Sequence, residues 1–278
     1  MKILIIGNGF LGSRCAAEWP DAILSGKILN SAEDVLSLLD EHKPDAVLNA
    51  AGIVGKPNVD WCEDHQTETI AGNTALPIMI AEGCQKRGTY LLHMGTGCIF
   101  YGASPTPGGW RETDYGNPVA VYTRSKYAAD LVLATLPNVG IARIRMPVDE
   151  ISSPGNLIDK LASFKKVADV ENSLTIVPDM IKVFRELLEK KAAGIFHVTN
   201  PGSVKHREIM EMYKEIVDPA FECEWISEQE LVDEGLAKKK RSNNIMSSEN
   251  LEKLGIKMRP VKEALRETLI NYAKLIKK

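Results

Sequence analysis

A glycine motif directly after an apolar run is the feature that most narrows how this chain can fold. Residues 1–6 read Met-Lys-Ile-Leu-Ile-Ile, and Gly7-Asn-Gly9-Phe-Leu-Gly12 follows without a gap. A short, continuous apolar run is typical of a strand covered on both faces in a parallel sheet. Glycines at this spacing permit a tight turn, a backbone approach to a pyrophosphate and close packing of the next helix. The segment therefore predicts a dinucleotide-binding turn made of Gly7, Asn8, Gly9, Phe10, Leu11 and Gly12.

Apolar strands and amphipathic helices alternate as far as Pro147. Further buried strands are predicted at 22–25, 46–49, 90–100 and 138–145, and helices at 31–43, from Asn73 to 85 and around 122–126. Repeated β-α units of this kind indicate an α/β fold with a Rossmann-like, doubly wound parallel sheet.

The rhythm breaks after Pro147, which suggests a second, smaller lobe. The pattern there predicts helices at 156–165, 179–191, 206–217 and from 261 on, a strand at 172–177 and one more sheet strand at 194–198. We expect a dinucleotide-binding Rossmann domain of residues 1–146 plus 179–198. Residues 147–178 and 199–278 would form a C-terminal substrate-binding lobe that caps the site of the sheet.

Thr96, Tyr122 and Lys126 are the candidate catalytic set. The tyrosine and lysine are four residues apart, so on a helix they lie on one face, one turn from each other. A phenol is a poor acid at neutral pH until a neighbouring cation stabilises its anion, and Lys126 can be that cation. Thr96 stands at the expected C-terminal end of a strand, where open α/β sheets build their sites. The set predicts redox chemistry at a carbonyl carbon, although a surface Tyr and Lys on an amphipathic helix would have the same spacing.

The turns after the second and third strands bear on the cofactor. Ser25-Gly-Lys27 stands where a ribose-binding carboxylate is usual, and Lys27 can pair with a 2′-phosphate that a carboxylate would repel. This favours NADPH over NADH, although a solvated lysine would look the same. Asn49-Ala-Ala-Gly52 leaves room for a flat ring or a phosphate, or is only a tight strand exit. Beyond the glycine turn, the predicted cofactor contacts are Ser25, Lys27, Asn49, Ala50, Ala51, Gly52, Asn73, Tyr122 and Lys126.

Charge and cysteine content narrow the class of protein. The net charge of −3 over 278 residues gives no general attraction to nucleic acid or to anionic membranes. Five scattered cysteines without a paired Cys-x-x-Cys argue for a reducing compartment and against structural zinc. The N-terminal apolar run is too short for a signal peptide or a membrane span. We expect a cytoplasmic enzyme without a metal.

Segments in a fixed order along nearly the whole chain resemble a known family. Besides the glycine turn they are Gly55–Glu63, Thr67–Thr69, Thr96–Phe100, Tyr122–Lys126, Arg143–Pro147, Thr199–Gly202, Glu211–Lys214 and Arg241–Asn244. On these residues the chain resembles the extended short-chain dehydrogenase/reductases. More narrowly it is similar to the plant-type nucleotide-rhamnose synthase/epimerase-reductases, and more distantly to the dTDP-4-dehydrorhamnose reductases. The resemblance implies that Thr96, Tyr122 and Lys126 are catalytic.

The resemblance also implies a substrate and two further catalytic residues. The substrate is a nucleotide-linked 4-keto-6-deoxyhexose, which is epimerised at C3 and C5 and then reduced at C4 with NADPH. Its C4 carbonyl acidifies the flanking protons, and the enolate oxygen needs the same donors as a later alkoxide. Cys98, two residues after Thr96 and on the same side if the chain is still extended, is a candidate acid/base, or a small buried residue. The resemblance places Lys160 as the opposing group, where a solvated lysine is the ordinary outcome.

Two polar clusters are candidates for binding the sugar nucleotide. Asp60, Trp61 and Glu63 combine an aromatic ring with carboxylates, which equally suit a helix start. Arg241 with Asn243 and Asn244 can grip a diphosphate, or form an exposed basic loop. The Gly- and Pro-rich residues 100–118 are expected to form a loop beside the pocket.

We therefore expect a 3,5-epimerase/4-reductase that makes UDP- or dTDP-L-rhamnose, with its substrate entering between the two domains. A homodimer paired through sheet-flanking helices would suit the family. The nearest rival is a 4-reductase without epimerase activity, in which Cys98 only packs. Another is a non-catalytic NADP-binding regulatory subunit, because this fold is also reused without catalysis.

Overall fold

A central sheet of six strands, in the order β10-β5-β4-β3-β1-β2, organises the α/β part of the chain. Strands β1 (Ile3–Ile6), β2 (Ala22–Ser25), β3 (Ala46–Asn49) and β4 (Tyr90–Thr96) pair in parallel. Strands β5 (Val139–Ile144) and β10 (Gly194–Val198) complete the sheet. The chain leaves β1 for β2 on one side and reaches β3 on the other. The winding direction thus reverses between β1 and β3, and the predicted Rossmann-like architecture is confirmed.

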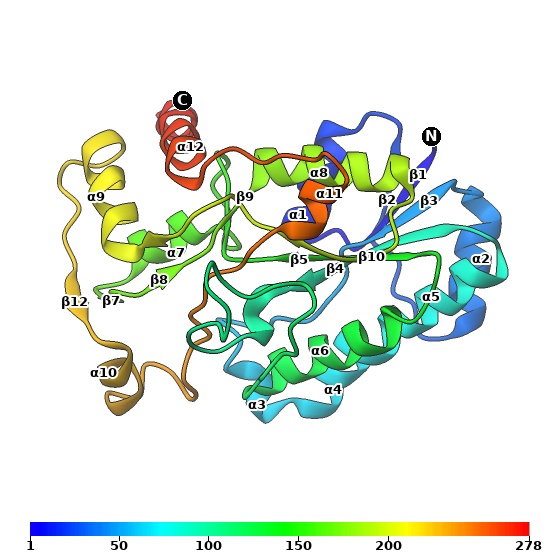
Figure 1. Cartoon of the computed structure of the whole chain (residues 1–278), viewed down its shortest axis with the longest axis horizontal. Coiled ribbons are helices and arrows are strands. Elements are labelled where there is room, and N and C mark those ends of the chain that lie inside the picture. The colour runs from blue at the N-terminus through cyan, green and yellow to red at the C-terminus, as the bar shows by residue number, and fades with distance from the viewer. Residues whose placement is uncertain (278) are drawn as a thin grey trace. The chain divides into compact units, whose positions relative to one another are not determined.

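Helices cover both faces of this sheet (Figure 1). Helices α1 (Phe10–Glu18) and α8 (Val177–Lys190) lie on one face, and α2 (Ala32–His42), α5 (Leu76–Lys86) and α6 (Val121–Leu133) on the other. The second face packs a core with residues such as Val35, Leu39, Ile80, Leu91 and Leu133, all 2% exposed or less. Burial of such side chains contributes about 1.5–3 kcal/mol each.

The structure is a computed structural model that describes residues 1–277, and these group into two compact units. Unit 1 comprises Met1–Ile99, Pro118–Arg143 and Ile181–Phe196, and unit 2 comprises Phe100–Asn117, Ile144–Met180 and the residues from His197 on. The Gly- and Pro-rich loop of residues 100–117 thus groups with unit 2, whereas the sequence-based division placed it in the range 1–146.

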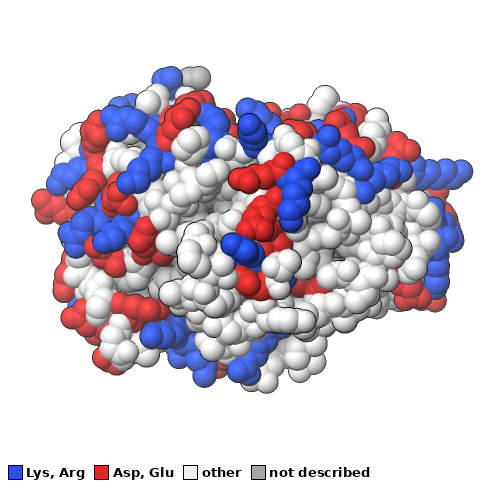
Figure 2. All heavy atoms as spheres, viewed as in Figure 1, with Lys and Arg blue, Asp and Glu red and all other residues white. Residues whose placement is uncertain are grey.

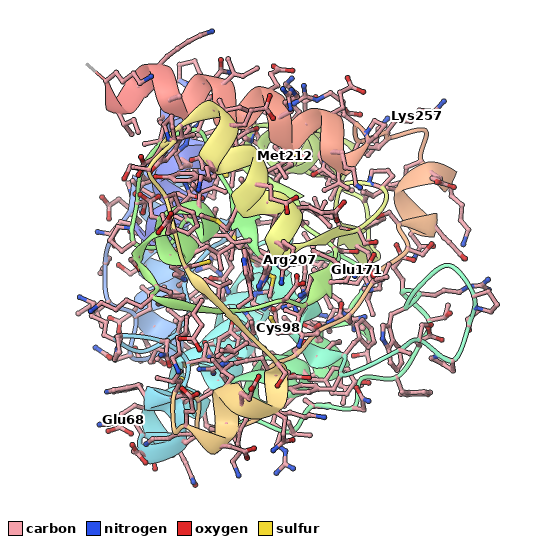
Figure 3. All side chains as sticks on the ribbon, turned by 90° about the vertical axis from the view of Figure 1, so that its left-hand side faces the viewer. Glu68, Cys98, Glu171, Arg207, Met212 and Lys257 are labelled. Carbon is pink, nitrogen blue, oxygen red and sulfur yellow. The ribbon has the colours of Figure 1, made fainter. Side chains whose placement is uncertain are left out.

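Unit 2 is built from helices and three small two-stranded sheets. Helices α7 (Leu157–Ser163), α9 (His206–Ile216) and α12 (Val261–Ile276) share one apolar core, and α9 carries Arg207 and Met212 (Figure 3). Two short helices, α10 (Glu228–Asp233) and α11 (Glu249–Lys253), complete its helices. Its sheets pair β6 (Pro147–Val148) with β9 (Thr175–Ile176), β7 (Lys166–Ala168) with β12 (Glu224–Ile226), and β8 (Glu171–Asn172) with β11 (Val204–Lys205).

Three predicted elements differ from the structure. The helix expected to begin at Asn73 begins at Gln66, as α4 (Gln66–Ile70), and passes through a π-helical turn η1 (Ala71–Ala75) into α5. The strand expected at 172–177 is split, because Asn172 and Thr175 pair with different strands and α8 begins at Val177. The strand expected to reach Phe100 ends at Thr96, where a 3₁₀ turn η2 (Gly97–Ile99) follows.

The surface carries mixed charge. On the face drawn in Figure 2, lysine and arginine side chains alternate with aspartate and glutamate side chains. Among residues 1–277 no helix has the length and apolarity to cross a membrane. The same residues hold no cluster of three or more His, Cys, Asp or Glu side chains suited to a metal ion.

A buried ion pair joins α6 to β5. Arg143 Nε donates to Asp130 Oδ2 over 2.9 Å, and both side chains are at most 2% exposed. Replacement of Asp130 by alanine leaves a guanidinium that stays charged, so the unfolding free energy should fall by about 3–5 kcal/mol in urea titrations.

The matched control is Asp40→Ala. Asp40 forms an exposed pair with Arg87 on the same unit, and its loss should cost about 0–1 kcal/mol. Equal losses for the two variants would contradict the importance given to burial.

Candidate functional site

Three turns meet at the C-terminal ends of β1, β2 and β3. Gly7 N donates to Ser25 O over 3.0 Å, and Ala50 N donates to Ile6 O over 2.9 Å. Gly7 has a φ of +107°, and a Cβ there would lie 2.6 Å from Ala51 N. Only glycine fits a position that combines a positive φ with so close a backbone neighbour.

The glycine turn leaves the N-terminus of α1 open for a ligand. Gly9 is the N-cap of α1 with no side-chain cap, the first turn holds no acidic residue, and a Cβ at Gly9 would meet no atom within 4 Å. Gly12 is buried against Gly7 O, so α1 lies close to the turn. Unsatisfied N–H groups at an uncapped helix start suit a phosphate, so this turn fits the pyrophosphate of a dinucleotide.

The turn after β2 carries no carboxylate. Ser25 is buried and its Oγ accepts from Lys27 N over 3.3 Å, while Lys27 itself is exposed. Hydrogen bonds from the backbone of Asn30 and from Ser31 lower the pKa of the Asp34 carboxyl. The charge of Lys27 lowers this pKa further, so Lys27 lies near Asp34. The site at the end of β2 thus has a cation available for a 2′-phosphate.

Asn73 fixes the loop that follows β3. Its Oδ1 accepts from Ile53 N and its Nδ2 donates to Ile53 O, each over 2.8 Å, and Nδ2 also lies 3.3 Å from Ser125 Oγ. The side chain is fully buried within η1, next to the Ala50-Ala51-Gly52 turn. The structure therefore gives Asn73 a role in holding this turn against α6.

Helix α6 carries Tyr122 in its first turn and Lys126 one turn later, and it packs on β4 and η2. Thr96 ends β4, and its Oγ1 accepts from Cys98 N over 3.1 Å, which bends the chain into the 3₁₀ turn. The chain is therefore not extended at Cys98, so strand alternation does not place its side chain relative to Thr96. Cys98 is partly exposed in that turn and is labelled in Figure 3. Thr96 itself is buried, at 5% exposure.

Lys126 is buried, with an exposure of 5%. Its Nζ donates to Met94 O over 2.8 Å and lies 3.3 Å from His93 Nε2. Burial lowers the pKa of Lys126 to about 8, and Asp130 one turn further along partly offsets this. A lysine of this kind can change its charge near neutral pH, as functional lysines do.

Glu63 supplies the cap that α6 lacks. Ala120, the N-cap residue of α6, has no side-chain cap, and Glu63 Oε1 accepts from Val121 N over 2.8 Å. Glu63 belongs to α3 (Trp61–Asp64), where Trp61 stacks on His65 with ring centroids 3.8 Å apart. Asp60 is the N-cap residue of α3 without a side-chain cap bond. The acidic residue predicted to bind substrate thus holds the start of the helix that bears Tyr122.

Unit 2 holds the other predicted residues. Lys160 is exposed in the last turn of α7. Asn244 is 3% exposed, and its Nδ2 donates to Phe100 O over 2.8 Å and to Ser242 Oγ over 2.9 Å. Asn243 Nδ2 donates to Glu228 Oε1 over 2.9 Å. An open pocket of about 210 Å³ is lined by Tyr101, Gly102, Glu228, Lys240, Arg241 and Asn243.

His93 is the site residue that sequence reasoning missed. Its strand was predicted, but a lone histidine in an apolar run gives no sign of its neighbours. The available signal is alternation along β4, which puts residue 93 on the same face as Leu91, and Leu91 belongs to the core under α6.

The family model for the RmlD substrate binding domain matches residues 1–274. A bifunctional dTDP-4-dehydrorhamnose 3,5-epimerase/dTDP-4-dehydrorhamnose reductase of Arabidopsis thaliana is 34% identical over 93% of this chain and 87% of its own length. A trifunctional UDP-glucose 4,6-dehydratase/UDP-4-keto-6-deoxy-D-glucose 3,5-epimerase/UDP-4-keto-L-rhamnose-reductase of the same plant is 34% identical over 95% of this chain, which spans 41% of that protein.

Solved structures agree with the fold. The UDP-rhamnose synthase of Acanthamoeba polyphaga mimivirus superposes with a TM-score of 0.91 at 29% identity, over 98% of this chain and 99% of its own. A dTDP-4-dehydrorhamnose reductase from Bacillus anthracis in complex with NADP has a TM-score of 0.82 at 21% identity, over 97% of this chain and 99% of its own.

Loss of the Glu63 cap should loosen α6. Glu63→Ala removes an acceptor at a helix N-terminus and should lower the unfolding free energy by about 1 kcal/mol. Glu63→Gln keeps an acceptor oxygen and should lose less, which chemical denaturation of both variants can measure. If the two variants lose the same unfolding free energy, the hydrogen bond to Val121 N is not the reason for the loss.

The buried amine should also make stability depend on pH. Unfolded Lys126 titrates near 10.5 and the folded residue near 8, so between these values the unfolded chain binds more protons and stability rises with pH. Relative to Lys126→Met, the unfolding free energy should rise by about 3 kcal/mol across that window.

Urea titrations near both ends of the window measure this difference. Lys86→Met, at an exposed lysine paired with Glu82, is the matched control. It should give no comparable change between the two pH values.

Proposed function

Because the chain belongs to the family of the RmlD substrate binding domain, we propose that it reduces the C4 keto group of a nucleotide-linked 4-keto-6-deoxyhexose with NADPH. The same protein epimerises the sugar at C3 and C5, so that the product is UDP- or dTDP-L-rhamnose. The single observation that carries the proposal is the arrangement around α6. This helix bears Tyr122 and Lys126, and it packs on the end of β4 with Thr96 and on the turn with Cys98.

The cofactor residues belong to unit 1. The open N-terminus of α1 and the Gly7–Ala51 approach suit the pyrophosphate, and Lys27 suits a 2′-phosphate. We therefore keep the glycine turn, Ser25, Lys27 and Ala50–Gly52 as direct contacts, with Asn49 and Asn73 as residues that hold the turn. NADPH, when bound, supplies the hydride that C4 receives.

Residues of the protein supply the proton that the oxygen at C4 receives. The Thr96 hydroxyl, whose oxygen already accepts from Cys98 N, is free to direct its hydrogen to the substrate oxygen at C4. The Tyr122 phenol gives its proton to the alkoxide that forms there, and a protonated Lys126 stabilises the phenolate that remains. The same two hydroxyls stabilise an enolate at that oxygen during epimerisation.

Epimerisation needs acid/base groups besides Tyr122. We propose Cys98, partly exposed in η2, and Lys160, exposed on α7, as two such groups. In unit 2 the pocket beside Arg241 and Asn243 is the proposed place for the diphosphate. We assign supporting roles to Asn244, Asp60, Trp61 and Glu63. Asn244 bonds to Phe100 O, Trp61 stacks on His65, and Glu63 caps α6.

We further propose a cytoplasmic location and a homodimer paired through sheet-flanking helices. None of the five cysteines, all within the described residues, forms a disulfide, which suits a reducing compartment. The net charge of −3 and the mixed surface charge favour a small-molecule substrate over nucleic acid.

A product assay tests the function. UDP- and dTDP-4-keto-6-deoxyglucose are each supplied with NADPH and no other enzyme, and mass spectrometry with sugar analysis identifies the product. Formation of rhamnose requires both epimerase and reductase activities in this chain. Reduction only of a pre-epimerised sugar would leave a monofunctional reductase, and no NADPH oxidation with any of these sugars would leave a non-catalytic subunit.

Replacement of Tyr122 by phenylalanine should separate the two activities. Without the phenolic proton, NADPH oxidation should fall by about 100-fold or more. Deuterium exchange from solvent at C3 or C5, followed by mass spectrometry, should stay detectable. Unchanged rates of both reactions would contradict the role given to Tyr122.

A further inference from the structure

His93 lies in a buried polar chain that runs from the turn after β3 to the catalytic helix. The side chain is fully buried on β4, with Asn49 Nδ2 3.1 Å from its Nδ1 and Lys126 Nζ 3.3 Å from its Nε2. Burial, helped by the charge of Lys126, lowers the pKa of His93 well below its usual value. The ring is therefore a neutral imidazole, with one nitrogen as donor and the other as acceptor.

The backbone of Ala51 decides which nitrogen carries the hydrogen. Ala51 N donates to Asn49 Oδ1 over 3.0 Å, so the oxygen of this amide points to the turn and its NH₂ group points to the ring. An NH₂ group can only donate, so His93 Nδ1 is the acceptor and Nε2 bears the hydrogen. That hydrogen points at Lys126 Nζ.

A lysine ammonium has three donors and no acceptor, whereas a neutral amine has a lone pair. With Nζ already donating to Met94 O, the chain of hydrogen bonds is complete only when Lys126 is the amine and accepts from His93 Nε2. We propose that His93 is a positioning residue, held in one tautomer by Asn49, that weakens the proton affinity of Lys126. The inference rests on the proposed function in one respect: it takes Lys126 as the partner of Tyr122.

Other groups around Lys126 also affect its proton affinity. Asp130, one turn along α6, favours the ammonium, and Arg143 on β5 neutralises that carboxylate. Tyr122 lies one turn before it on α6. The turns that pack on this helix carry Asn73 and Thr74, which bond to Ser125, and Cys98. From β4, Met94 O accepts from Lys126 Nζ and His93 Nε2 directs its hydrogen at it, so the His93 tautomer opposes Asp130.

The consequence for catalysis is an upper pH limit set by His93. Tyr122 needs a cation beside it, and this is lost when Lys126 gives up its proton. Because the ring donates to the amine, removal of the ring should raise the proton affinity of Lys126. The proposed chain also joins Lys126 to the Asn49–Ala51 turn, so its charge state and the shape of the turn are coupled.

A test by NMR needs no catalytic activity. In protein with ¹⁵N-labelled imidazoles, two-bond ¹⁵N–¹H correlations distinguish the two neutral tautomers, and His93→Leu identifies the His93 signals among five histidines. Above the titration of Lys126, His93 should be the Nε2–H tautomer. As the pH falls its signals should shift with a single midpoint, and this shift should vanish in Lys126→Met. A Nδ1–H ring, or a shift that persists in Lys126→Met, would overturn the proposal.

The second test measures the alkaline limb of the reductase pH profile. His93→Leu should move that limb upward by about one pH unit, a tenfold rise in the proton affinity of Lys126. Leu91→Val, on the same face of β4, is the matched control and should leave the limb in place. A lower kcat at an unmoved limb would make His93 merely structural. If no substrate is turned over the proposed function fails, and the NMR result still decides the assignment of His93.

Discussion

The close approach of backbone at the ends of β1 and β3 is the constraint on which unit 1 depends. Gly7 lies so near Ala51 that no side chain fits between them, and Gly12 packs on the carbonyl of Gly7 in turn. Three strands can therefore end together, with the start of α1 directed at the space beyond them. The close packing of its neighbours leaves Gly9 as the open start of α1, where we propose that a phosphate binds.

The burial of polar and charged groups under α6 costs free energy, which the packing of the rest of unit 1 offsets. Lys126, Asp130, Arg143 and His93 are each at most 5% exposed and lie next to the apolar core of unit 1. Charges in such places are tolerated when they are paired and hydrogen-bonded, and they shift one another's pKa values. Desolvation raises the pKa of Asp130 although Arg143 opposes it, and desolvation lowers that of Lys126. The electrostatics of the helix are thus set from its buried side.

The sequence predicted the strands and most helices of unit 1 because their signals are local. The apolar run before Gly7, the strand at 46–49 and the capped helix after Ser31 each follow from spacing and composition. The π-helical turn around Asn73 was missed, and the bonds of its side chain to Ile53, 20 residues away, have no local signal in the sequence. Short strands of unit 2 were missed for the same reason: Asn172 and Thr175 are neighbours in sequence but pair with different partners. Tyr122 and Lys126 were found by spacing, whereas the cap at Glu63 and the contact of His93 exist only in three dimensions.

The segment of residues 100–117 is fastened by chain that comes much later. Gly102 N donates to Asn243 O, Trp110 N to Ile245 O and Ser247 N to Trp110 O, over 2.8–3.1 Å. During synthesis on the ribosome, the first four sheet strands emerge and can pair long before residues 242–247 exist. Although this loop follows β4 closely, more than a hundred further residues must be made before these three backbone hydrogen bonds can form. This part of unit 2 is therefore synthesised early but can complete its folding only late.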